Sequence, residues 1–228
     1  MDSTGLYDAF RTDVVDTARP YLWSDDEVWR YAADAQRQFV RLTGGVSDVL
    51  SDATAVGIVA GEAWADLHPS ILRIMAATRR SDHKPIELIN STDLGKMRSS
   101  DYGQIKALIL DELEGPVRYG VIGLQRNKIR WVQVPLVDDI VDLHVYRTAL
   151  TIIDGPDQEI ADIDEEHHLR LLDWMKHLAY KKQDVDTYDP RRSAQAEQDF
   201  RVYCDQVKAE WERYKAKPVR VVSYGGLL

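Results

Sequence analysis

The sequence lacks the features that mark disulfide-stabilised, secreted or membrane-spanning proteins. Its 228 residues include one cysteine, Cys204, so no disulfide can form within the chain, and the composition suits a reducing cytoplasm. No apolar run approaches the roughly 20 residues of a membrane-spanning helix. The acidic N-terminus lacks the charged-then-apolar layout of a signal peptide. We therefore expect a soluble protein that is made in the cytoplasm and has no membrane partner.

Positive charge is also scarce. The chain has 29 Lys and Arg against 38 Asp and Glu, a formal net charge of −9, which argues against a protein that grips phosphates across a broad basic face. The charge is unevenly spread: residues 1–35 hold eight acids and three bases, whereas the chain from Arg213 onward holds four bases and no acid. A regulatory nucleic-acid-binding protein is accordingly a minor alternative.

Two helices are predicted in the first 48 residues. Leu6, Phe10 and Val14 are spaced as one face of a helix from Thr4 to about Ala18, and Arg19-Pro20 ends it because the residue before proline avoids the α region. A second helix begins at Ser24, where Glu27 completes a capping box, and ends at Gly44-Gly45. Its apolar stripe consists of Val28, Ala32, Ala35, Phe39 and Leu42.

Two more helices are predicted near the C-terminus. The first begins at Asp162, with Glu165 completing a capping box, and closes at Lys181-Lys182. The second restarts at Asp189-Pro190, with Asp as N-cap and Pro at the first helical position. The apolar stripes are Leu171, Trp174, Met175, Leu178 and Ala179 in the first helix, and Ala196, Phe200, Tyr203, Val207, Trp211 and Tyr214 in the second.

The middle of the chain favours strands. Residues 71–78 and 85–89 predict one hairpin, residues 117–124 and 128–134 a second, and residues 141–147 alternate apolar and polar side chains. The predicted fold is α+β, mainly a helical bundle. Residues 1–48 and 162–216 form the bundle, residues 49–161 a small inserted antiparallel β-domain, and residues 217–228 an extended C-terminal arm.

No catalytic constellation stands out. Glu165 and His168 have the E-x-x-H spacing of metal ligands on one helical face, but a second copy and further carboxylates are missing. We therefore favour a capping role and keep a metal-dependent bundle enzyme as an alternative. Cys204 is best explained as a packed helical residue. The Asp138-Asp139 pair and the aspartates at 184, 186 and 189 fit turns and caps better than a metal site. The prediction is a protein that is not an enzyme and has no cofactor or metal.

Two stretches carry a resemblance to a known family. One is Val14-Val15-Asp16-Thr17-Ala18-Arg19-Pro20-Tyr21-Leu22-Trp23-Ser24-Asp25-Asp26-Glu27-Val28. The other runs from Glu165-Glu166-His167-His168-Leu169-Arg170-Leu171-Leu172-Asp173-Trp174 to Leu178-Ala179-Tyr180-Lys181-Lys182-Gln183-Asp184-Val185-Asp186-Thr187-Tyr188. Both resemble the head-to-tail adaptor (connector, or head-completion) proteins of tailed bacteriophages, while the β insert resembles them only in layout.

The resemblance implies a structural virion protein of the head–tail neck. Members of the family form a ring, usually dodecameric, that links the portal protein to the tail tube or tail-completion protein and continues the DNA channel without sequence-specific binding. A neighbouring tail component, such as a tube or stopper protein, is the alternative. The portal-docking residues would be Lys217, Val219, Arg220, Val221, Val222, Tyr224, Leu227 and Leu228. The candidates for lining the channel, where acids would repel phosphates, are Asp138, Asp139 and Asp142.

Overall fold

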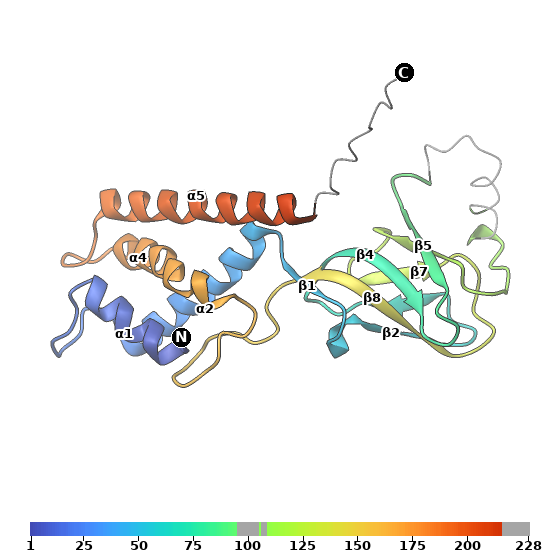
Figure 1. The fold of residues 1–228 in the computed structure, drawn as a ribbon, viewed down its shortest axis with the longest axis horizontal. Helices are drawn as coiled ribbons and strands as arrows, with labels where there is room; N and C mark the ends of the chain where they lie inside the picture. Colours follow the sequence, from blue (N-terminus) through green and yellow to red (C-terminus); the bar gives the residue numbers. More distant parts are fainter. Residues whose placement is uncertain (95–104, 106–108, 216–228) are drawn as a thin grey trace, which may run out of the picture. The chain divides into compact units, whose positions relative to one another are not determined.

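The computed structural model describes residues 1–94, 105 and 109–215. The chain divides into two compact units (Figure 1). The helical unit combines Met1–Gly44 with the chain from Ile152 onward, and the β unit is Gly45–Thr151. The α+β class predicted from the sequence is confirmed, with helices on both sides of a strand-rich middle.

The two N-terminal helices are α1 (Ser3–Asp13) and α2 (Asp25–Thr43). Helix α2 has the predicted capping box between Ser24 and Glu27, and it ends at Gly44, whose φ of 101° requires a residue without a side chain. The predicted end of α1 near Ala18 is wrong. Val15 adopts a φ of 58°, and this left-handed residue turns the chain so that the amide of Asp16 donates to the Arg11 carbonyl.

The C-terminal helices are α4 (Leu171–Lys181) and α5 (Pro190–Lys215). The predicted helix start at Asp162 is wrong: a 3-10 helix, η2 (Glu165–Arg170), precedes α4, and the residue before η2 is Asp164. No capping box forms there: η2 begins after Asp164 without a side-chain cap, and Glu165 binds the amino group of Met1 at 2.6 Å. The start of α5 is as predicted, since the Asp189 carboxylate accepts hydrogen bonds from the amides of Arg191 and Arg192.

The predicted stripes pack against one another in the helical unit. The ring of Phe200 on α5 lies 5.2 Å from that of Trp174 on α4 and 6.4 Å from that of Phe39 on α2, centroid to centroid. The most deeply buried apolar side chains, at most 2% exposed, are Leu6, Phe10, Trp23, Val28, Ala32, Ala35, Val40, Ile153, Ile160, Leu171, Met175, Ala179, Phe200, Cys204 and Val207. Helical spacing alone therefore identified most of this core.

The β unit is larger than the small antiparallel domain predicted from the sequence. It holds eight strands: β1 (Val46–Asp48), β2 (Ala55–Ile58), β3 (Trp64–Asp66), β4 (Ile71–Arg79), β5 (Pro85–Asn90), β6 (Tyr119–Ile122), β7 (Lys128–Trp131) and β8 (Asp139–Arg147). They form one curled sheet, a half-barrel, in the order β1-β8-β4-β5-β6-β7-β3, with β2 also paired to β8. The sheet is mixed rather than antiparallel, because β5 and β6 pair in parallel.

The β4–β5 and β6–β7 hairpins and strand β8 occur where the sequence predicted them, with ends shifted by a few residues. The prediction missed β1, β2 and β3, and it treated the long return from β5 to β6 as a break between hairpins. The three missed strands are only three or four residues long. A run of that length is too short for alternation to be recognised, so only pairing with β8 and β7 defines these strands.

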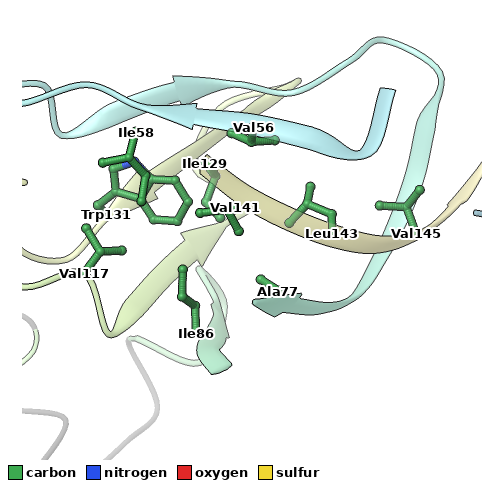
Figure 2. Packing of buried hydrophobic residues seen from close by; sticks show 10 residues of the cluster. All are labelled: Val56, Ile58, Ala77, Ile86, Val117, Ile129, Trp131, Val141, Leu143 and Val145. Atoms are coloured by element: carbon green, nitrogen blue, oxygen red, sulfur yellow. The ribbon is translucent and has the colours of Figure 1, made fainter. Parts of the chain in front are cut away.

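The inner face of the curled sheet holds the core of the β unit. Figure 2 shows the Trp131 ring between Ile58 and Val117, with Val141, Leu143 and Val145 following one another along β8. These three β8 residues are at most 1% exposed, so the predicted alternation holds from Val141 to Val145, whereas Tyr146 is buried too. The full cluster is Val56, Ile58, Ala77, Ile86, Val117, Ile129, Trp131, Val141, Leu143 and Val145.

A buried ion pair joins β1 to the end of β8. The Arg147 guanidinium donates to the Asp48 carboxylate, and both side chains are less than a tenth exposed. Asp48 also accepts from the Ser51 hydroxyl and from the amides of Leu50 and Ser51. Burial by itself would raise the pKa of Asp48, but Arg147, Ser51 and the two amides outweigh it and hold that pKa well below its ordinary value. The folded β unit therefore favours the charged carboxylate.

Asp48→Asn is expected to destabilise the β unit by roughly 1.5–3 kcal/mol at neutral pH, because a hydrogen bond to a charged partner is lost. Since the folded pKa is depressed, the stabilisation is complete above the unfolded pKa of about 3.9 and fades as the pH falls below it. Urea unfolding should show a difference in the free energy of unfolding between wild type and variant that is constant from pH 7 to 5 and narrows toward pH 3. A difference in the free energy of unfolding that is unchanged at pH 3 would contradict the assigned ion pair.

Candidate functional site

The first stretch that carries the resemblance folds around a buried arginine. Arg11 is 4% exposed, and its guanidinium donates to the Asp16 carboxylate, to the Trp23 carbonyl and to the Asp25 carboxylate. It also stacks on the ring of Tyr21, 4.1 Å from the centroid. Asp16 in turn accepts from the amides of Leu22 and Trp23. The network closes the loop between α1 and α2, and both terminal nitrogens of the guanidinium are used within it, while the Arg11 Nε is buried without a partner among the described residues.

The second stretch packs directly against the first. The indole N–H of Trp23 donates to the Ala179 carbonyl on α4, and the Trp23 ring meets that of Tyr180 edge-on at 6.1 Å. Lys182 pairs with Glu27 at 2.9 Å. The two stretches, whose contacting residues are more than 150 positions apart, thus meet inside the helical unit. The residues that carry the resemblance chiefly specify the fold of this unit.

The E-x-x-H pair does not form a site. Glu165 is largely exposed and bound to the Met1 amino group, whereas His168 is buried and its Nε2–H donates to the Ile163 carbonyl at 2.8 Å. Residues i and i+3 of the 3-10 helix η2 point the same way, but one side chain of the pair is exposed and the other is buried, and each already has a partner. Buried His177 lies against Ser193 of α5. Within the described residues, no three His, Cys, Asp or Glu side chains are grouped to hold a metal ion.

Cys204 is a core residue of α5, as the sequence predicted. Its side chain is fully buried. Burial is the largest influence on the thiol and raises the pKa of Cys204 to about 12. A thiol with such a pKa carries almost no thiolate at neutral pH, so it is unsuited to nucleophilic chemistry.

The three acidic candidates for lining a channel lie at the start of β8 and already have partners within the β unit. Asp138 accepts from the Ala60 amide at 2.7 Å, and Asp139 accepts from the Ser81 hydroxyl. Asp142 forms a two-pronged pair with Arg80 that leaves both side chains about half exposed. Arg80 lowers the pKa of Asp142 below its ordinary value, so the carboxylate stays charged, but the same arginine offsets its field. Each of the three carboxylates is thus held by its own partner in the β unit.

The residues predicted to dock on a portal, Lys217 to Leu228, lie outside the described residues. The described part of the chain ends with α5, whose last turns carry Arg213, Tyr214 and Lys215. Of the aspartates in the α4–α5 loop, Asp189 caps α5, as predicted, whereas Asp184 and Asp186 are exposed.

The sequence analysis missed both buried ion pairs. Arg11 and Asp16 lie five residues apart across the end of a helix, and Asp48 and Arg147 are separated by 99 positions. Nothing in the spacing distinguishes these charges from the many exposed ones. The only available signal is that Arg11 occupies a position beside the apolar stripe of α1, which a helical projection would have shown.

Comparisons with known proteins identify a family for this chain. Every helix of the described part is too short or too polar to span a membrane. No curated protein matches the chain. The family model described as SU10 adaptor protein matches residues 1–222, which covers both units and confirms the resemblance carried by the two terminal stretches. The chain belongs to the SU10 adaptor protein family, a family of phage head-to-tail adaptors, and is accordingly a structural protein.

Proposed function

We propose that this adaptor forms a ring in the neck of a tailed phage, where it connects the portal protein to the tail and continues the DNA channel. The family match over residues 1–222 is the observation that carries the proposal. One feature of the structure supports it. The polar side chains of the terminal stretches form hydrogen bonds within the helical unit and so serve its fold. The expected partners are the portal protein, a tail tube or tail-completion protein, and further copies of the chain.

Residues 217–228 are proposed as the portal-docking segment. Their valines favour extended structure, and extended segments bind by adding to sheet edges or by lying in grooves. Asp138, Asp139 and Asp142 are proposed to line the channel, where carboxylates would repel the phosphates of passing DNA. Because Arg80 offsets Asp142, Asp138 and Asp139 would contribute most of the negative potential.

Truncation after Ala216 is expected to weaken portal binding by roughly tenfold or more, because binding energy concentrates in a few apolar and aromatic anchors. The truncation removes no described residue, so the folded units should remain intact, as circular dichroism can verify. The measurement is the affinity of purified chain for purified portal. Lys217→Gln with Arg220→Gln is the matched variant: it keeps the valines and separates the contribution of charge from that of apolar contact.

Electron cryomicroscopy of the portal vertex tests the location directly. A ring of this chain below the portal, with its C-terminal residues directed toward it, is the expected result. Density for the chain further down the tail would favour a tail tube or stopper component instead. Absence of the chain from purified virions, or full portal affinity of the truncated chain, would contradict the proposal for the whole chain or for the docking segment, respectively.

A further inference from the structure

The apolar face of α5 extends past the residues that are buried in the core of the helical unit. Phe200, Cys204 and Val207 are at most 2% exposed, and each contributes to the core of the helical unit. The stripe continues at Trp211, which is half-buried, and at Tyr214, which is 93% exposed. The last two turns of α5 thus present the same apolar face without a covering element among the described residues. An uncovered aromatic continuation of a buried stripe is typical of a surface that binds a partner.

The last three residues of α5 also carry two bases, Arg213 and Lys215, and the Nζ of Lys215 lies 5.4 Å from the centroid of the Trp211 ring. The guanidinium of Arg213 donates to the Ala209 carbonyl of its own helix, and no carboxylate in the described part of the chain pairs with it. Glu210 and Glu212 precede it, but the sequence from Arg213 onward has four bases and no acid. The end is therefore aromatic and basic, and the surface that best complements it is apolar and acidic.

A surface of that kind lies at the other end of α5. The α4–α5 loop, residues 183–189, contains three aspartates and no base. Its Val185 side chain is 99% exposed and Tyr188 is 53% exposed. Asp184 and Asp186, which flank Val185, are exposed and form no ion pair within the described residues. The loop thus displays an apolar tip between two carboxylates.

The loop is held in place although its tip is exposed. The Asp189 amide donates to the Tyr180 carbonyl at 3.0 Å, and the Tyr188 amide donates to the Asp184 carbonyl at 3.1 Å. Thr187 is buried, which anchors the loop between its exposed neighbours. A surface that is already ordered loses little entropy on binding.

The two complementary surfaces cannot meet within one subunit. Helix α5 spans 26 residues, about 39 Å at 1.5 Å per residue, and Figure 1 shows it running without interruption between them. We propose that the α4–α5 loop of one subunit binds the C-terminal end of α5 of a second copy, with Val185 against Tyr214 and the two aspartates facing Arg213 and Lys215. Such a contact joins two different patches, as a heterologous ring interface requires. The inference rests on the proposed ring and names its interface.

A charge exchange tests the interface. Asp184→Lys/Asp186→Lys and Arg213→Glu/Lys215→Glu are each expected to weaken self-association by roughly tenfold or more, since like charges then face each other. The quadruple variant should regain most of the lost affinity. Glu159→Lys/Asp205→Lys makes the same change in net charge as the aspartate pair, at exposed positions away from both surfaces, and should leave association unchanged. Sedimentation velocity, with and without purified portal, measures the assembly. All substituted residues are exposed, so circular dichroism should confirm unchanged folding.

Cross-linking provides a second readout. In a Cys204→Ala background, Val185→Cys combined with Tyr214→Cys should give disulfide-linked oligomers, whereas either cysteine alone should give at most dimers. The inference is overturned if both charge-reversal variants assemble like wild type, or if wild type never self-associates. It is also overturned if the quadruple variant self-associates no more tightly than either double variant. Presence of the chain in virions and portal affinity are measured separately, so failure of this interface leaves the adaptor proposal standing.

Discussion

Replacing Arg11 by methionine is expected to destabilise the helical unit by about 3–5 kcal/mol, the usual cost of removing one partner of a buried ion pair. Asp16 is 3% exposed and would lose the guanidinium that pairs with it. The Trp23 carbonyl would also lose a donor. Hydrogen exchange under native conditions should show the loss in the amides of α1 and α2, because local stability is read there directly.

Two further variants test whether the loss of stability comes from the network around Arg11. Arg11→Met with Asp16→Asn should cost less than the sum of the single substitutions, because the unpaired buried charge is removed. Arg30→Met is the matched control: Arg30 is exposed on α2, donates to the Asp26 carbonyl of its own helix and forms no ion pair among the described residues, so a change within about 0.5 kcal/mol is expected. Equal effects at Arg11 and Arg30, or strictly additive effects at Arg11 and Asp16, would rule out the proposed coupling.

Trp131→Ala should destabilise the β unit by about 3–5 kcal/mol, the range for deleting a large buried aromatic ring. Trp131 is fully buried and lies between Ile58 and Val117 in the core of the half-barrel (Figure 2). The ring also fits closely against Gly120, where an added Cβ would come within 3.2 Å of it. Hydrogen exchange in β7 and β8 would locate the loss in this unit.

Trp131→Phe separates ring packing from hydrogen bonding. The indole Nε1 is buried and has no hydrogen-bond partner among the described residues, so phenylalanine removes an unsatisfied donor and offsets part of the lost packing. We expect a cost of about 1–2 kcal/mol, well below that of alanine. Trp64→Ala on β3 is the matched control, since Trp64 is 38% exposed, and should cost less than about 1 kcal/mol. A similar cost at both tryptophans would contradict the core position of Trp131.

Helical spacing and capping chemistry were enough to predict most of the helical unit. The stripe of α2, its capping box and the Asp-Pro start of α5 all occur as expected. These signals are local: a cap needs residues within one turn, and a stripe needs a period of 3.6 residues. The start of α4 was mispredicted because residues 165–170 form a 3-10 helix, in which Glu165 binds the distant Met1 amino group and takes no part in a cap.

The sequence by itself thus determined the fold class, the four helices and the strands long enough to alternate. It also carried the family resemblance that the family match confirms. Only the tertiary structure decided the parallel pairing of β5 and β6, the three short strands and the curl of the sheet. The pairing of Arg11 with Asp16 and of Asp48 with Arg147, and the exposure of Val185 and Tyr214, are likewise visible only in the tertiary structure. The physical reason is that pairing and burial depend on which distant residues meet, and local spacing holds no information about those meetings.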